Sequence, residues 1–198
     1  DSLPAAAAAA LAHAGRVDIM VHNAGISQRS LVADTELEVD RRLLEVNFFG
    51  TVALTKAILP AMLAAGGGRF VVVTSLVGRI GTPLRSGYAA SKHALHGFFD
   101  SLRAELHDRG IRVTLACPGF IKTELPLAAL TGDGTPQGTM DRAQREGYPA
   151  DRCAEKILRA VERDREEVLI GGKERFAVYL KRFLPGLFSR IIRKARVT

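Results

Sequence analysis

Short apolar runs alternate with longer helix-like stretches along most of the chain. Four runs have the length and the β-branched content of strands. They are residues 17–21 (VDIMV), 69–74 (RFVVVT), 111–116 (IRVTLA) and 167–170 (EVLI). The first run is mostly apolar and bounded by turn residues, which predicts a strand of a parallel sheet that is buried on both faces.

The stretches between these runs have the composition and spacing of helices. They cover residues 5–14, 36–64, 86–109 and 151–163. Strands that alternate with helices of ten or more residues predict right-handed βαβ units. The chain is therefore expected to form an α/β fold around a parallel sheet.

Asn47 and Gly50 interrupt the predicted helix at residues 36–64. Asn47 is flanked by Val46, Phe48 and Phe49, so it is expected to be buried and to need hydrogen-bond partners. The local sequence leaves two interpretations open for Asn47, a structural hydrogen-bond network and a catalytic role.

Two segments stand outside the alternating pattern. Residues 124–149 are rich in Gly, Thr and Pro, and a connection of this length is a lid, a binding loop or a disordered segment. Residues 173–198 read as a basic amphipathic helix that breaks at Pro185-Gly186 and then resumes. We expect a domain at 1–172 and an extension at 173–198, which either packs on protein or contacts anionic lipid.

Composition and charge narrow the class of protein. The 198 residues are 47% hydrophobic and 25% charged, as in one globular domain, and no apolar run reaches the ~18 residues of a membrane span. The net charge of +7 lies entirely in residues 173–198 (8 basic − 1 acidic), while residues 1–172 are balanced (20 against 20). A nucleic-acid-binding surface is therefore not expected. Cys117 and Cys153 lack metal-ligand spacing, so we expect reduced thiols and no metal site in a cytoplasmic protein.

The segment from Thr74 to Leu95 carries the candidate chemistry. Tyr88 and Lys92 share one face of a predicted helix, and Ser75 lies 88 − 75 = 13 residues upstream at the end of a strand. A nearby ammonium lowers the pKa of a phenol, and a serine hydroxyl can hydrogen-bond a carbonyl oxygen. The set suits proton transfer to or from an oxygen. A Tyr–Lys pair alone is more often a solvated lysine beside a half-buried tyrosine.

Three more elements accompany this segment in order along the chain. They are HNAG at 22–25, Asn47 within EVNFFG, and CPGFIKT at 117–123. With Ser75 and YAASK at 88–92, the chain resembles the short-chain dehydrogenase/reductase family over essentially its whole length. The resemblance implies a doubly wound, Rossmann-like parallel sheet.

Two stretches of sequence indicate a particular branch of the family: the residues around Tyr88 and the LPGLF segment at 184–188. Both are similar to a membrane-associated branch of the family. That branch includes acyl-dihydroxyacetone-phosphate reductases and related lipid or steroid carbonyl reductases.

The resemblance also implies roles for individual residues. Tyr88 would exchange a proton with the substrate oxygen, and Ser75 would orient that oxygen. Lys92 would lower the Tyr88 pKa and bind the nicotinamide ribose, and Asn47 would hold a water beside Lys92. Residues 124–149 would be the substrate lid. The implied cofactor-binding residues are Asn23, Ala24, Gly25, Tyr88, Lys92, Pro118, Gly119, Ile121 and Thr123.

One family element is missing from this sequence. The family places a Thr-Gly-x-x-x-Gly-x-Gly loop after its first strand to receive the cofactor pyrophosphate, whereas Gly66-Gly67-Gly68 precedes a strand here. The first three family strands are absent, so the chain alone is expected to bind cofactor poorly. We expect a fragment of a longer enzyme rather than a truncated chain, because the strand at 17–21 would form an exposed, aggregation-prone sheet edge.

The expected function is the NAD(P)(H)-dependent interconversion of a ketone or aldehyde and an alcohol, with NADP slightly preferred over NAD and a lipophilic small-molecule substrate. The alternative is a non-catalytic interaction protein or fragment that uses its basic tail at membranes. A cytoplasmic location, peripheral to a membrane, is expected. A homodimer or homotetramer through the helices at 36–64 and 86–109 is implied by the resemblance only.

Overall fold

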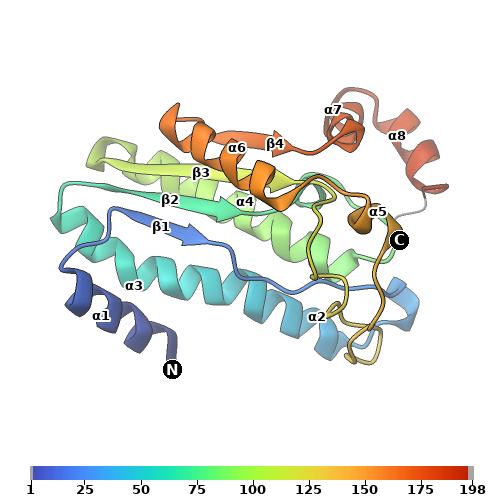
Figure 1. Ribbon diagram of the computed structural model, residues 1–198, viewed down its shortest axis with the longest axis horizontal. Helices are drawn as coiled ribbons and strands as arrows, with labels where there is room; N and C mark the ends of the chain where they lie inside the picture. The colour runs from blue at the N-terminus through green and yellow to red at the C-terminus, as the bar shows by residue number, and fades with distance from the viewer. Residues whose placement is uncertain (1, 196–198) are drawn as a thin grey trace.

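The computed structural model describes residues 2–195, which form a fully parallel four-stranded sheet with helices on both faces (Figure 1). The strands lie in the order β1-β2-β3-β4 across the sheet. Their bounds are β1 (Ile19–His22), β2 (Gly68–Val73), β3 (Ile111–Pro118) and β4 (Glu167–Ile170). The predicted α/β fold with a parallel sheet is therefore confirmed, and each predicted strand matches an observed one.

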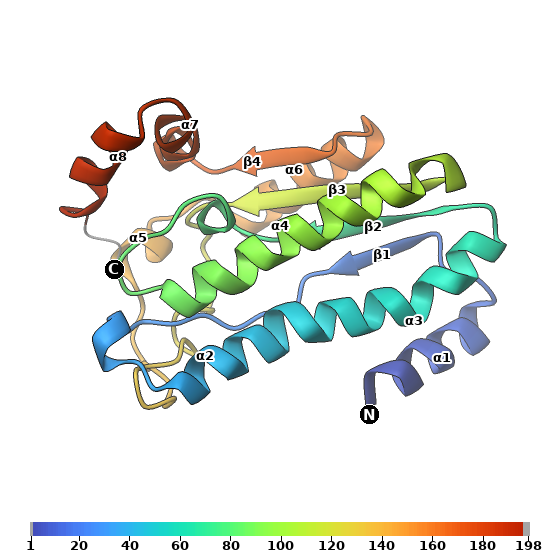
Figure 2. The ribbon, with the colours of Figure 1, turned by 180° about the vertical axis from the view of Figure 1, so that it is seen from behind.

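Three long helices form the layer on one face of the sheet. Figure 2 shows α3 (Gly50–Ala64) and α4 (Ser86–Leu106) side by side there, with α1 (Ser2–Ala14) packed against α3. The opposite face carries α6 (Ala150–Glu162), which packs on β3 and β4. The largest buried cluster lies between the sheet and the first layer, and includes Phe70, Val72, Leu95, Phe99 and Leu115.

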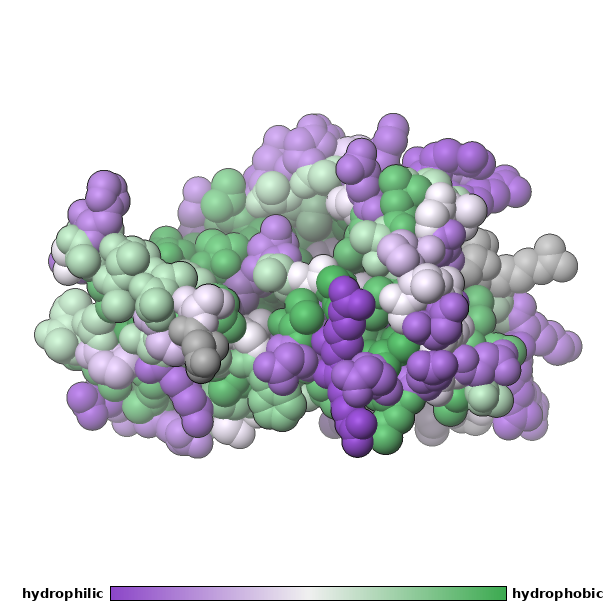
Figure 3. Space-filling model, turned by 90° about the horizontal axis from the view of Figure 1, so that it is seen from below, coloured by the Kyte–Doolittle hydropathy of each residue, from purple (hydrophilic) through white to green (hydrophobic). Residues whose placement is uncertain are grey.

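The first strand is buried on one face only, so the prediction of a strand buried on both faces is wrong. Ile19 and Val21 are 52% and 53% exposed, whereas Met20 packs against the core cluster. The physical reason is that α6 packs on β3 and β4, and β1 lies at the sheet edge, as the family strand order implied. Seen from below, the middle of the molecule shows apolar surface next to strongly hydrophilic side chains (Figure 3).

The predicted interruption at Asn47 is confirmed as a π-helical turn. It consists of η2 (Glu45–Phe49), which joins α2 (Leu37–Leu44) to α3. Such turns are rare and occur frequently at functional sites. The combined helix Leu37–Ala64 contains an 18-residue window with a mean hydropathy of 1.5 and is long and apolar enough to cross a membrane, a property that it shares with core helices of soluble proteins.

The two segments outside the alternating pattern pack against the rest of the chain. Residues 124–149 contain α5 (Arg142–Arg145) and pair with the loop after β1, where the Arg29 N–H donates to Leu130 O (2.8 Å). The tail forms α7 (Phe176–Phe183) and α8 (Pro185–Ile192), so Pro185 begins the second helix. The expected boundary between a domain at 1–172 and an extension at 173–198 remains a prediction. Short 3-10 turns complete the elements: η1 (Val32–Asp34), η3 (Leu76–Gly78), η4 (His107–Arg109) and η5 (Lys173–Arg175).

Candidate active site

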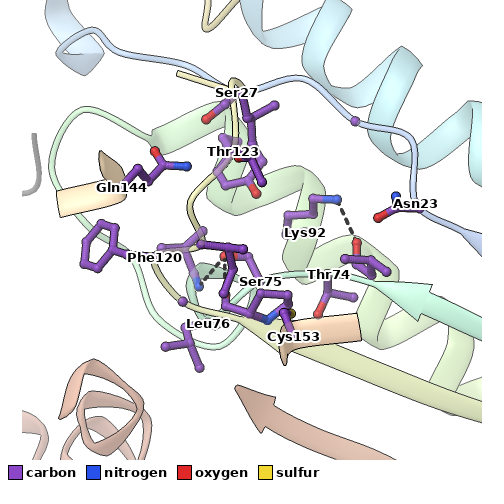
Figure 4. A pocket seen from close by; sticks show the side chains of 18 of the residues that line it. Asn23, Ser27, Thr74, Ser75, Leu76, Lys92, Phe120, Thr123, Gln144 and Cys153 are labelled. Carbon is purple, nitrogen blue, oxygen red and sulfur yellow. Dashed lines mark hydrogen bonds between the residues drawn. The ribbon is translucent and has the colours of Figure 1, made fainter. Parts of the chain in front are cut away.

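One cavity of about 770 Å³ is lined by all three candidate residues of the Thr74–Leu95 segment, which are Ser75, Tyr88 and Lys92. Ser75 follows the carboxyl end of β2, and Tyr88 and Lys92 lie in the first two turns of α4. Figure 4 shows Lys92 and Asn23 at one end of the pocket and Phe120 and Gln144 at the other, with Ser75 between them. Open α/β sheets bind ligands at this edge, beyond the carboxyl ends of their strands.

Ser75 connects two of the loops that line the cavity. Its hydroxyl donates to Pro118 O (3.2 Å) and accepts a hydrogen bond from the Val77 N–H (3.3 Å), which caps the 3-10 turn η3. Ser75 also hydrogen-bonds the Tyr88 side chain. The two hydroxyls are thus close enough to bind one oxygen atom of a ligand between them.

Tyr88 is buried, and its pKa differs from the expectation. Burial raises the pKa of Tyr88 above its usual value of 10.0, while the hydrogen bond to Ser75 and the positive charges of Arg85 and Arg29 act against that rise. The expected lowering of this pKa by Lys92 is therefore wrong for this chain. The reason is geometric, because the Lys92 Nζ lies 5.9 Å from the Tyr88 ring centroid and donates to a main-chain carbonyl instead.

Lys92 is held at the base of the cavity. Its ammonium donates to Val73 O (3.0 Å), and burial lowers the pKa of Lys92 to about 8. An ammonium has three donors, so two remain for a ligand. This donor set fits the neighbouring hydroxyls of a nicotinamide ribose.

Asn47 is fully buried behind the cavity and forms a hydrogen-bond network with its neighbours. Its Oδ1 accepts from the Ile26 N–H (2.8 Å), and its Nδ2 donates to Ile26 O (3.0 Å) and Ser91 Oγ (2.9 Å). Both amide hydrogens are therefore used, and the structural interpretation of Asn47 applies. One acceptor position remains on Oδ1, and a water held beside Lys92 stays a prediction.

Most of the predicted cofactor-binding residues line the cavity. These are Asn23, Gly25, Tyr88, Lys92, Pro118, Gly119, Ile121 and Thr123. Ala24, which lies between Asn23 and Gly25 in sequence, does not line the cavity. A Cβ at Gly25 would lie 3.1 Å from Asn47 Oδ1 and 3.3 Å from Lys92 Nζ, so only glycine leaves the backbone open to a ligand there. The glycine backbone and the free lysine donors together fit the ribose end of a nicotinamide cofactor.

Gln28 is a site residue that the sequence did not indicate. Its side chain is fully buried, and its Oε1 accepts from the main-chain N–H groups of Gly87 (2.9 Å) and Tyr88 (3.3 Å) at the start of α4. The helix has no side-chain cap from its own N-cap residue, Arg85. Gln28 therefore caps the catalytic helix from a distant loop, which no local sequence signal could reveal.

A buried ionic cluster also lies beside Tyr88 and was not predicted. Arg29 and Arg85 both pair with Asp141, at 2.5 Å and 3.3 Å, and Arg29 also donates to Gln144 Oε1 (2.9 Å). Asp141 and Gln144 come from the segment 124–149, so this cluster ties that segment to the catalytic helix. Single charged residues far apart in sequence gave no pattern from which to find it.

Cys117 lies in a cluster of possible metal ligands that the spacing of residues along the chain did not reveal. His96, Cys117 and Glu167 bring their side-chain ligand atoms within 4.8 Å of one another. Arg79 already pairs with Glu167, and burial raises the pKa of the Cys117 thiol to about 12. Ion pairing and a protonated thiol both disfavour a metal ion here.

Known proteins resemble this chain in both sequence and fold. A sequence profile for short chain dehydrogenases matches residues 1–130. Dehydrogenase/reductase SDR family member 7B of Xenopus laevis is 48% identical over 180 residues, which are 90% of this chain and 56% of that protein. The mouse (Mus musculus) protein of the same name is 43% identical over 96% of this chain and 59% of its own length. The chain thus spans little more than half the length of these relatives.

Solved structures agree with the sequence matches. A short-chain dehydrogenase from Streptomyces avermitilis superimposes with a TM-score of 0.78 at 29% identity, over 96% of this chain and 73% of that one. A short chain dehydrogenase from Burkholderia cenocepacia, solved with NADP, gives a TM-score of 0.78 at 26% identity, over 96% and 74% of the two chains. Sequence, fold and the convergence of Ser75, Tyr88 and Lys92 lead to one conclusion: this chain belongs to the short-chain dehydrogenase/reductase family.

Proposed function

We propose that the whole protein is an NAD(P)(H)-dependent oxidoreductase that interconverts a ketone or aldehyde and an alcohol. The observation that carries this proposal is the meeting of Ser75, Tyr88 and Lys92 at one cavity beyond the carboxyl ends of the strands. The nicotinamide cofactor would supply or accept the hydride. The residues of this chain then have to bind the substrate oxygen and move a proton.

In this proposal Ser75 and Tyr88 hold the substrate oxygen between their hydroxyls, and Tyr88 transfers the proton. Lys92 orients the cofactor ribose with its two remaining donors, and Asn47 keeps the loop after β1 against α4. A water beside Asn47 and Lys92 completes the path by which Tyr88 recovers its proton. Because burial raises the Tyr88 pKa, the phenol is protonated at neutral pH and is ready to act as an acid.

The same proposal extends to the cofactor, the substrate, the assembly and the location of the protein. NADP is the preferred cofactor, and the largely apolar lining of the cavity, with Leu76, Ile80, Phe120 and Leu125, suits a lipophilic substrate. A homodimer or homotetramer would form through the faces of α2, α3 and α4. A cytoplasmic location and peripheral membrane contact through residues 173–198 belong to the same proposal.

The test is cofactor oxidation by the whole protein with a panel of ketones and aldehydes of increasing chain length. We expect NADPH to be consumed faster than NADH, with kcat/KM rising as the apolar chain lengthens. The second candidate function is a non-catalytic interaction protein that uses its basic tail. Oxidation of neither cofactor by any carbonyl, together with binding of vesicles by the tail, would favour that candidate.

A further inference from the structure

Arg29 lines the catalytic cavity at its Gln144 end, and its side chain is held entirely by the protein. Its Nε and Nη2 donate to Asp141 Oδ2 (2.8 and 2.5 Å), and Nη2 also donates to Gln144 Oε1 (2.9 Å). Its Nη1 donates to Ser27 Oγ (2.8 Å) and to Gln28 O (2.6 Å). A guanidinium has five N–H donors, and these contacts use all five. Arg29 therefore has no donor left for a ligand.

The contact with Arg29 fixes the direction in which the Gln144 amide points. A guanidinium only donates, so the amide atom that faces it must be the oxygen, and the NH2 group is turned away from it. Gln144 is 7% exposed and lines the cavity, and nothing among residues 2–195 accepts a hydrogen bond from its Nε2. Figure 4 shows this nitrogen directed toward the middle of the pocket. The amide thus offers its N–H donors to a ligand.

Ser27 repeats this arrangement from the loop after β1. Its hydroxyl oxygen accepts from Arg29 Nη1 (2.8 Å), and Ser27 is 1% exposed and lines the same cavity. Its O–H donates to no other described residue, so this donor remains for a ligand. Because Ser27 and Gln144 contact the same guanidinium, their donors lie close together. Arg29 thus occupies an acceptor atom of each side chain and leaves the donors to the cavity, which suits an acceptor oxygen of a ligand.

This arrangement gives the buried ionic cluster a role in binding. The side chains of Arg29 and Asp141 are 4% and 2% exposed, so their burial carries a desolvation penalty that consumes most of the gain from pairing. The ion pair is therefore weak evidence for stability, but it fixes the orientation of its neighbours. Asp141 holds the guanidinium, and the guanidinium holds Gln144 and Ser27. The resulting donors lie at the end of the cavity opposite Lys92, as the position of Gln144 in Figure 4 shows.

We propose that Gln144 and Ser27 form a subsite that binds an uncharged acceptor oxygen of the substrate, separate from the carbonyl oxygen that Ser75 and Tyr88 hold. A hydroxyl, an ether or an ester supplies such an oxygen. The inference rests on the proposed function, and it adds one polar determinant of specificity to a largely apolar cavity. A site built to hydrogen-bond a substrate oxygen rejects analogues that lack it, because its buried donors are then left unpaired.

The test compares ketones of equal chain length with the whole protein. One methylene at a time is replaced by an ether oxygen or carries a hydroxyl, and the all-carbon ketone is the reference. At one position kcat/KM should exceed the reference at least about tenfold, the gain expected from two hydrogen bonds. The variant Gln144→Glu still accepts from Arg29 but turns an oxygen toward the cavity, so the ratio for the ether should fall to one or below. Ser27→Ala should lower the same ratio about threefold.

The matched control is Gln137→Met, in the same segment as Gln144. Gln137 donates to Asp141 Oδ1 (3.3 Å) but does not line the cavity, so this variant should keep the parent ratio. A ratio between two substrates, measured on one preparation, is unaffected by loss of folded protein. Three results would each overturn the subsite: equal kcat/KM at every oxygen position, an unchanged ratio in Gln144→Glu, or a stronger preference for a ketone that carries a carboxylate.

Calorimetric titration of the same ketones separates this inference from the proposed function, because it needs no turnover. The parent protein should bind the preferred ether about tenfold more tightly than the all-carbon ketone. If neither ketone is reduced, the proposed function fails, and that difference in Kd still supports the subsite. Equal binding of the two ketones, or binding of neither, would overturn it.

Discussion

Gln28 offers a sharp test of how the fold positions Tyr88. The change Gln28→Met keeps the length of the side chain and removes both polar ends. The N–H groups of Gly87 and Tyr88 then lose their acceptor, and neither has a partner within the first turn of α4. Loss of a helix cap costs about 0.5–2 kcal/mol, and a buried unsatisfied polar group about 1–3 kcal/mol.

We therefore expect the free energy of unfolding to fall by about 2–4 kcal/mol in the Gln28→Met variant, which lowers Tm by roughly 10 °C. The first turn of α4 should also loosen and displace the Tyr88 hydroxyl. A displacement of ~1 Å is enough to reduce kcat by up to about 100-fold. Steady-state kinetics of the whole protein, at a temperature where both variants are folded, would measure the change.

The matched variant is Gln28→Glu, which keeps an acceptor for the two N–H groups. The hydroxyls of Ser30, Thr35 and Ser86, which face the Gln28 Nε2, can turn to donate to the second carboxylate oxygen. Its kcat should lie close to that of the parent protein. A Gln28→Met variant that is less stable yet keeps the parent kcat would refute the positioning argument. Gln28 would then contribute to stability only, and not to the placement of Tyr88.

Two further predictions concern pH. The kcat/KM for carbonyl reduction should fall as pH rises through about 8, where Lys92 loses its proton, while oxidation should gain from higher pH because Tyr88 must ionise; a reductive profile that is flat to pH 10 would contradict this. Burial lowers the pKa of His22 to about 4 and that of His96 to about 3, so the unfolded chain binds more protons below pH 6.5 and stability falls as pH falls. From pH 7 to pH 5 each histidine should cost about 2 kcal/mol, and urea unfolding of His22→Asn should show about half of the parent's loss.

Periodicity predicted the elements of the fold because each is formed by a local pattern. The four strands, the helices α1, α4 and α6, and the combined helix Leu37–Ala64 fall within a few residues of their predicted bounds. The break at Asn47 was also local, since an asparagine among apolar residues departs from a helical pattern. Periodicity does not show which strands are covered by helices on both faces of the sheet. The prediction that the first strand is buried on both faces was therefore wrong, because Ile19 and Val21 are exposed.

The site divides in the same way. The sequence was sufficient to predict Ser75, Tyr88 and Lys92 as site residues, because they lie within one short segment and have a recognisable spacing. Gln28, Arg29 and Asp141 were not, since their roles depend on contacts between loops that are distant in sequence. The direction of the Tyr88 pKa shift was missed for a related reason. Burial and the orientation of the Lys92 ammonium decide that shift, and neither can be read from a four-residue spacing.

The most direct measurement of the central claim is single-turnover reduction by the Tyr88→Phe variant of the whole protein, with cofactor affinity measured on the same preparation. If Tyr88 delivers the proton at the cavity it shares with Ser75 and Lys92, hydride transfer should fall at least about 100-fold, the lower range of acid catalysis. The cofactor Kd should change little, because Lys92 and the Gly25 backbone remain in place. Hydride transfer at the parent rate would contradict the assignment.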